Sequence, residues 1–202
     1  MVAAQIAKIK GCRVVGIAGG AEKCRYLKEV LELDEVVDYK SDDFKTALEK
    51  ATPKYIDAFF DNGIAILPSG ADCSWWEGSG GVSCPRSSTC SVWNSYRQLI
   101  CRYSICGAIS QYNSRKPIGP KTFNNIIAQR IKVEGFIIFD YEKRFSEARR
   151  EIAGWLKSGK LKRQEWIVEG GIEKAEEGLQ GLFSGKNLGK CLIKVGKEKS
   201  RL

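Results

Sequence analysis

The sequence contains no histidine among its 202 residues. Histidine is the base in Ser-His-Asp triads and Cys-His pairs, and it is a common ligand of catalytic metals. Its absence excludes these three kinds of site unless a partner chain supplies the residue. The chemistry that remains must use Lys, Tyr, Cys, carboxylates, backbone amides or a cofactor, and we expect no metal site.

Long hydrophobic runs are also missing. No apolar run approaches the ~18–20 residues that a membrane helix needs. The first residues, MVAAQIAKIKGC, are interrupted by Lys8 and Lys10 and lack the layout of a secretory signal. We therefore expect a cytoplasmic protein without a membrane partner.

Positive charge is in excess. The 33 Lys and Arg residues outnumber the 24 Asp and Glu residues, which gives a net charge of +9. Apart from the ending KVGKEKSRL these cations are scattered, which favours a solvated surface over a nucleic-acid partner. A small ligand that carries phosphate would suit the same excess. A basic nucleic-acid-binding α/β protein remains the alternative, supported by the charge and by Trp75 and Trp76, which could stack on bases.

The spacing of apolar residues predicts helices that alternate with strands. In the first third of the chain we expect helices over 2–9, 21–31 and 41–48, the last capped by Ser41, and strands over 12–18, 36–37 and 55–60. Later we expect strands over 99–106, 131–139 and 191–195, and helices over 121–130, 145–156 and 172–182. This alternation is typical of an α/β fold, in which helices wrap a parallel sheet.

One stretch, residues 64–105, breaks the pattern. It has no Lys, and it holds four of the eight cysteines and three of the five tryptophans. Its cysteines are 11, 6 and 11 residues apart, unlike the paired steps of zinc sites. Nothing indicates an oxidising compartment that would favour disulfides. We interpret the stretch as an irregular insertion, and translation in a wrong frame or through an intron would explain its composition.

The run GIAGGAEK, residues 16–23, ends a strand in glycines and begins a helix at once. Backbone amides at such a turn can hold an anion, and glycine lets a ligand approach closely. In a dinucleotide-binding fold an acid beside the ribose binds the 2′-hydroxyl of NAD, whereas a cation accommodates the 2′-phosphate of NADP. Gly19, Gly20 and Lys23 favour the phosphorylated ribose, and Glu22 opposes it. A glycine turn followed by a surface lysine is the simpler alternative.

Six motifs, in order, give the chain a resemblance to a known family. They are QIAKIKGCRVVGIAGGAEKCRYL, DEVVDYKSDDF, FFDN, CGAISQYN, VEGFIIFDY and GKNLGK. Together they resemble the zinc-independent medium-chain dehydrogenase/reductases, and within these the NADPH-dependent 2-alkenal (double-bond) reductases and prostaglandin reductases. The resemblance covers about 1–62 and 105–196.

The resemblance implies a Rossmann-like fold, NADP(H) as cofactor, a homodimer, and hydride transfer to the β-carbon of a small α,β-unsaturated aldehyde or ketone. Lys23 and Tyr39 are expected at the 2′-phosphate, and Cys106 to Tyr112 along the nicotinamide half. Tyr112 is also the candidate catalytic residue, assisting the enolate oxygen. The full set of cofactor-binding residues carried over by motif is Gly19, Lys23, Tyr39, Asn62, Cys106, Gly107, Ala108, Ile109, Ser110, Gln111, Tyr112, Phe136, Ile137, Ile138 and Asn187.

Comparison with the family also predicts the domain organisation. Residues 1–63 and 106–160 correspond to two parts of the cofactor domain, 64–105 to the insertion, and 161–202 to a C-terminal helix and strand that return to the substrate domain. We find no counterpart of the first Rossmann strand or of its glycine-rich loop, so we expect an incomplete parallel sheet. A non-catalytic chain, or an interaction module that binds no cofactor, is therefore the alternative function.

Overall fold

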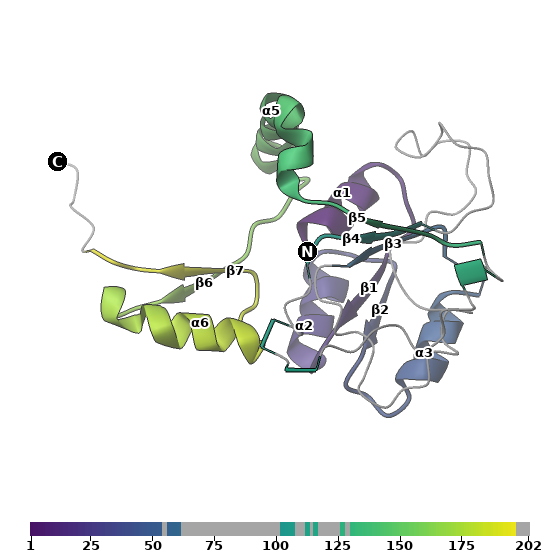
Figure 1. Cartoon of the computed structure of the whole chain (residues 1–202), viewed down its shortest axis with the longest axis horizontal. Coiled ribbons are helices and arrows are strands. Elements are labelled where there is room, and N and C mark those ends of the chain that lie inside the picture. Colours follow the sequence, from purple (N-terminus) through teal and green to yellow (C-terminus); the bar gives the residue numbers. More distant parts are fainter. Residues whose placement is uncertain are drawn as a thin grey trace. The chain divides into compact units, whose positions relative to one another are not determined.

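The computed structural model describes residues 1–53, 56–61, 102–107, 112–113, 115–116, 126–127 and 130–196. Helices and strands alternate in the first and last parts of these ranges, three strands follow one another between them, and every pair of neighbouring strands is parallel (Figure 1). The expected α/β class, with parallel sheets and flanking helices, is therefore confirmed. The chain divides into two compact units, Met1–Leu161 and Lys162–Leu202.

The first unit begins with a two-stranded sheet. Strand β1 (Val15–Ala18) pairs with β2 (Glu35–Asp38), and Ala18 lies opposite Asp38 at the end of both strands. The helical elements around them are α1 (Val2–Ile9), α2 (Ala21–Arg25), its continuation as a π-helical turn (Tyr26–Val30), and α3 (Phe44–Ala51).

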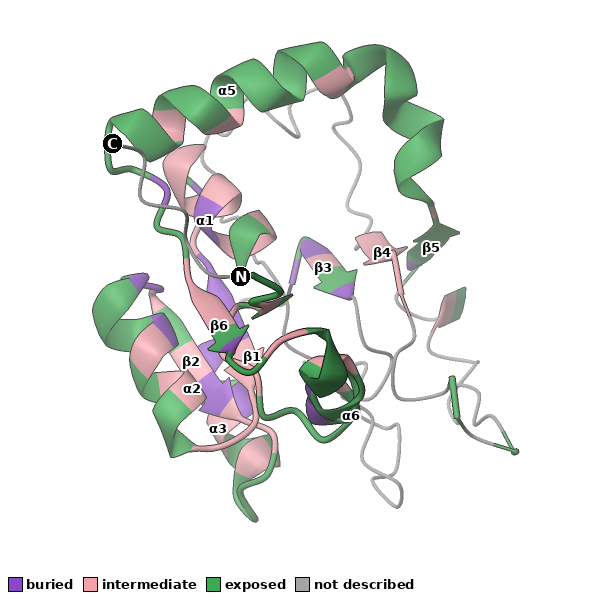
Figure 2. Ribbon diagram, turned by 90° about the vertical axis from the view of Figure 1, so that its left-hand side faces the viewer, coloured by how far each residue is buried: buried purple, intermediate pink, exposed green. Residues whose placement is uncertain are grey.

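Both faces of this sheet are covered. On one face Val14 belongs to an apolar cluster with Cys12, Leu27, Leu31 and Leu33, against which Ala4 and Ala7 of α1 pack. On the other face Val15 and Val37 pack with Leu48 and Ala51 of α3. Successive residues of a strand point to opposite sides, so adjacent valines supply both cores. Figure 2 shows the buried residues concentrated around β1 and β2.

The same unit contains a second, three-stranded sheet. Strand β4 (Arg102–Ile105) lies between β3 (Ala58–Asp61) and β5 (Lys132–Gly135). A 3-10 turn (Ile138–Arg144) and helix α5 (Phe145–Lys157) follow β5. Within the described ranges, β1–β2 and β3–β4–β5 form separate sheets. Strand β4 overlaps the last residues of the stretch expected to be irregular, and 64–101 lies outside the described residues.

The second unit is a strand–helix–strand motif. Strand β6 (Glu165–Val168) pairs in parallel with β7 (Lys190–Ile193), and a 3-10 turn (Ile172–Lys174) and helix α6 (Ala175–Phe183) connect them. The helix packs closely on β6, because a Cβ added to Gly181 would collide with the ring of Trp166. The sequence interpretation missed β6. No helix in the described part of either unit is long and apolar enough to cross a membrane.

Several element boundaries expected from sequence are wrong. The first strand begins at Val15 rather than at residue 12. Helix α3 begins at Phe44, because Ser41 forms a turn in which its carbonyl accepts the Phe44 N–H at 3.1 Å and its hydroxyl donates to Asp43. Strand β5 ends at Gly135, because the Ile137 N–H donates to the Asp140 carboxylate at 3.0 Å and the chain turns. The helix expected over 121–130 lies largely outside the described residues.

Candidate functional site

The candidate site begins where β1 and β2 end. Because the strands are parallel, their carboxyl ends lie at one edge of the sheet, and ligands of open α/β sheets bind at such edges. Gly19 and Gly20 follow β1, and Tyr39 and Lys40 follow β2. The Tyr39 N–H donates to the carbonyl of Ala18 at 2.9 Å, which ties the two segments together just beyond the strands.

Asp38 holds this edge in place. Its carboxylate accepts the Gly20 N–H through both oxygens, at 3.0 and 3.1 Å, and the Lys40 N–H at 2.9 Å. These backbone hydrogen bonds, the one from Gly20 being the largest effect, hold the pKa of Asp38 below its usual value. The carboxylate is therefore committed to fixing the turn after β1 against the turn after β2.

The ring of Tyr39 lies directly against Gly19. A Cβ built on Gly19 would stand 2.5 Å from Cζ and 2.6 Å from the hydroxyl oxygen of Tyr39. Any side chain at position 19 would thus displace the ring. The glycine that the sequence placed at a ligand-binding turn also makes room for the tyrosine expected beside the phosphate.

Two ammonium groups accompany this contact. Burial lowers the pKa of Lys23, which lies in α2, and the positive charge of Lys40 lowers it further, while Glu22 acts in the opposite direction. Lys40 is exposed and follows the end of β2. Two cations within electrostatic reach of one another, beside a half-buried tyrosine, are a suitable arrangement for binding a phosphate group.

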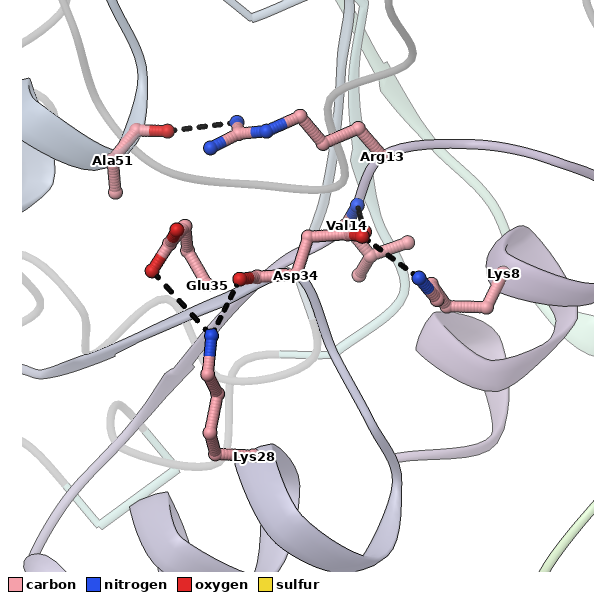
Figure 3. A network of polar contacts seen from close by, with 7 residues as sticks. All are labelled: Lys8, Arg13, Val14, Lys28, Asp34, Glu35 and Ala51. Atoms are coloured by element: carbon pink, nitrogen blue, oxygen red, sulfur yellow. Dashed lines mark hydrogen bonds and ion pairs between the residues drawn. The ribbon is translucent and has the colours of Figure 1, made fainter.

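A polar network fixes the opposite, amino-terminal ends of β1 and β2 (Figure 3). The Asp34 carboxylate accepts the ammonium of Lys8 at 2.8 Å and the Val14 N–H at 2.6 Å. Lys28 donates to the Asp34 carbonyl at 2.6 Å and pairs with Glu35. Burial raises the pKa of Asp34, but the bonds from Lys8 and Val14 outweigh it, so this pKa lies below its usual value. The network orients the strands that present the site at their other ends.

The carboxyl ends of β3 and β4 carry a second group of polar side chains. Tyr103 donates its hydroxyl hydrogen to the buried carboxylate of Asp61 at 2.6 Å, and burial together with this bond raises the pKa of the Tyr103 hydroxyl. The Cys106 N–H donates to the Asp61 carbonyl at 2.9 Å. Burial and the Asp61 charge raise the pKa of the Cys106 thiol, so this residue is not set up as a nucleophile.

Phe136 joins this edge from β5. Its N–H donates to the carbonyl of Ile105 at 3.1 Å, and its ring contacts those of Phe60 and Tyr141, with centroids 6.1 and 5.8 Å apart. Ile137 and Ile138, which follow, are 61% and 65% exposed. The carboxyl edge of this sheet thus presents Cys106 and an apolar surface around Phe136 side by side.

The remaining residues named from the sequence stay predictions. Asn62 and Ala108 to Gln111 lie outside the described residues, Gly107 directly follows Cys106, and Tyr112 is 66% exposed. Asn187 belongs to the second unit, where its side-chain N–H donates to the Gly189 carbonyl at 2.8 Å in the loop before β7. That bond gives Asn187 a role in its own turn.

Sequence reasoning missed Asp38 and Lys40. Both belong to the motif DEVVDYKSDDF, in which only Tyr39 was singled out. Their position at the end of a predicted strand, next to a glycine turn of the neighbouring strand, was the available signal. Within the described part of the chain, no group of three or more Cys, Asp or Glu side chains could hold a metal ion.

Known dehydrogenases and reductases are similar in sequence to this chain. Residues 1–66 match the family model described as zinc-binding dehydrogenase. The chain is 42% identical over 195 residues to YfmJ of Bacillus subtilis, an alignment that covers 95% of this chain and 51% of that protein. It is 38% identical over 200 residues to the NADPH-dependent curcumin reductase of Escherichia coli, covering 95% of this chain and 50% of the relative.

A solved structure agrees with these relatives. CurA from Vibrio vulnificus, crystallised in complex with NADPH, has 35% sequence identity and a TM-score of 0.72, with 96% of this chain and 52% of that chain covered. The chain spans about half the length of the relatives it matches. With the parallel α/β fold, the chain is similar, over about half of their length, to NADP-dependent alkenal, prostaglandin and curcumin reductases.

Proposed function

We propose that this chain is the NADP(H)-binding part of a reductase that saturates the C=C bond of small α,β-unsaturated aldehydes or ketones. The observation that carries the proposal is the contact of Gly19 with Tyr39 at one sheet edge, with Lys23 in the short helix that begins directly after Gly20. Relatives of the chain include NADPH-dependent reductases, which supports the same cofactor.

The edge formed by β1 and β2 has the chemistry for a 2′-phosphate. Gly19 carries no side chain, so backbone and ligand can approach each other there. The phenol of Tyr39 can donate a hydrogen bond to a phosphate oxygen, and the Lys23 ammonium supplies a compact positive charge. The hydrogen-bonding capacity of the Asp38 carboxylate is directed at the backbone N–H groups of Gly20 and Lys40, while its negative charge remains at this edge.

The edge formed by β3, β4 and β5 would serve the nicotinamide half. When bound, NADPH supplies the hydride, and the product gains a proton at the α-carbon. Cys106 and Phe136 would border the ring with backbone groups and an apolar surface, which exclude water. Tyr112 stays our candidate for a hydrogen bond to the enolate oxygen. The proposal includes a cytoplasmic site of action and a homodimer.

Reduction of 2-hexenal by NADPH deuterated at the transferable position of C4 tests the proposal. Saturation of the C=C bond gives hexanal with deuterium on the β-carbon, whereas carbonyl reduction gives 2-hexenol with deuterium on C1. We expect the first product, and a weaker reaction with Lys23→Ala at limiting NADPH. Formation of 2-hexenol, or equal rates with NADH and NADPH, would contradict the proposal.

A second candidate is a chain that binds a partner without reducing a substrate. The separation of β1–β2 from β3–β4–β5 within the described ranges favours it, because each sheet then has an edge strand whose backbone groups can pair with another strand. The two candidates differ in one result: a partner-binding chain yields no deuterated hexanal at any NADPH concentration.

A further inference from the structure

Lys40 is held beside the proposed phosphate site by its own backbone. The Lys40 N–H donates to Asp38 at 2.9 Å, and the same carboxylate accepts the Gly20 N–H at 3.0 Å. The chain segment that carries Lys40 is therefore fixed against the turn that carries Gly19. The preceding residue, Tyr39, is bonded to Ala18 and lies against Gly19.

The charge of Lys40 acts on the same groups. Burial lowers the pKa of Lys23 most, and Lys40 is the next largest cause. Lys40 also contributes to the lowered pKa of Asp38, after the backbone bonds from Gly20 and Lys40 itself. Its ammonium is thus within electrostatic reach of both side chains that flank the turn after β1.

Counting the charges at this edge shows why a second cation matters. Two acids, Glu22 and Asp38, lie beside two ammonium groups, Lys23 and Lys40, so the four side chains together are neutral. Without Lys40 the edge would carry a net negative charge. A phosphate monoester carries about −1.5 to −2 charges at pH 7, so its binding at this edge is less favourable without the Lys40 charge.

We propose that Lys40 is a second cation for the 2′-phosphate of NADP(H), acting together with Lys23 and contributing to the choice of NADPH over NADH. The inference rests on the proposed function and adds a specificity-determining residue to it. Phosphate between the two ammonium groups also relieves their mutual repulsion. Because Lys40 is exposed, its contribution weakens as salt is added.

The test compares Lys40→Gln with Lys50→Gln, which removes an equal charge from an exposed position on α3. Affinities of the full chain are measured for NADPH and NADH, and for adenosine 2′,5′-bisphosphate and 5′-AMP. We expect Lys40→Gln to lower the affinity for NADPH and for adenosine 2′,5′-bisphosphate about fivefold. The affinities for NADH and 5′-AMP should stay unchanged. Lys50→Gln should leave all four affinities unchanged, and Lys40→Arg should restore most of the loss.

Two outcomes separate this inference from the proposed function. If the unmodified chain prefers NADPH and Lys23→Ala removes that preference, but Lys40→Gln has no effect, Lys40 plays no part and the proposed function stands. An equal loss of NADPH and NADH affinity in Lys40→Gln would likewise overturn the inference, because it would indicate a structural defect. If the unmodified chain binds none of the four ligands, both proposals fail.

Discussion

The two carboxylate oxygens of Asp38 accept the backbone N–H of Gly20 at 3.0 and 3.1 Å, across the ends of two neighbouring parallel strands. This contact makes the conformation of the glycine turn depend on the strand beside it. The turn after β1 is therefore built by residues 18 positions apart in sequence, and the candidate phosphate site depends on the same contact.

Replacing Asp38 by Ala should loosen both turns. We expect the free energy of unfolding to fall by about 1.5 kcal/mol, the low end for hydrogen bonds to a charged group, because Asp38 is half-exposed. NADPH affinity should fall as well, since Gly20 and Lys40 lose their shared acceptor. Urea unfolding and NADPH titration measure the two effects. An unchanged NADPH affinity would show that the hydrogen bonds to Asp38 do not support the site.

The Asp38 carboxylate should also make the stability of the folded chain depend on pH. The pKa of Asp38 is lower in the folded chain than the ordinary value of about 3.9. Its stabilising contribution is therefore complete above the unfolded pKa and is lost as the pH falls through the folded pKa. The stability difference between the unmodified chain and Asp38→Asn should be constant from pH 5 to 7 and shrink below about pH 4. A difference that grows on acidification would have the wrong sign.

Gly19 and Tyr39 should show coupled effects on stability. Gly19→Ala places a Cβ 2.5 Å from Cζ of Tyr39, so the ring must move. We expect a loss of about 1–3 kcal/mol, which is typical of overpacking. In a chain that already carries Tyr39→Ala, the same change should cost much less. A double-mutant cycle by urea unfolding measures this coupling, and strictly additive effects would contradict the contact.

Asp34 should matter more than its surface position suggests. Asp34→Ala removes the acceptor of both Lys8 and the Val14 N–H, and Val14 itself is fully buried. An N–H left without its acceptor costs about 1–3 kcal/mol. Asp42→Ala, at an exposed position, is the matched control and should change stability by less than about 0.5 kcal/mol. Equal effects of the two substitutions would refute the structural role of Asp34.

The core of the first unit offers a simpler test of packing. Leu48 on α3 is 1% exposed, whereas Leu179 on α6 in the second unit is 55% exposed. Leu48→Ala should cost about 2–5 kcal/mol because it leaves a cavity, and Leu179→Ala should cost far less. Thermal unfolding of both variants gives the comparison, and a small effect of Leu48→Ala would place α3 elsewhere.

The sequence predicted the α/β alternation because adjacent apolar residues such as Val14 and Val15 mark a strand buried on both faces. It misplaced the start of α3, since the turn at Ser41 depends on Asp43, and propensity alone does not show which of two polar residues caps a helix. It missed β6, in which three apolar residues lie between the charged residues Glu165 and Glu169. The resemblance to a known family identified Lys23 and Tyr39 as candidate site residues. Lys40 could be identified only from the structure, in which its N–H donates to Asp38.

The most direct test of the account is a fluorescence titration of the purified chain with NADPH and with NADH, on the unmodified chain, Lys23→Ala and the control Lys50→Gln. The account predicts that the unmodified chain and the control bind NADPH at least about tenfold more tightly than NADH, and that Lys23→Ala reduces this preference. Equal affinity for the two nucleotides, or no binding of either, would contradict it.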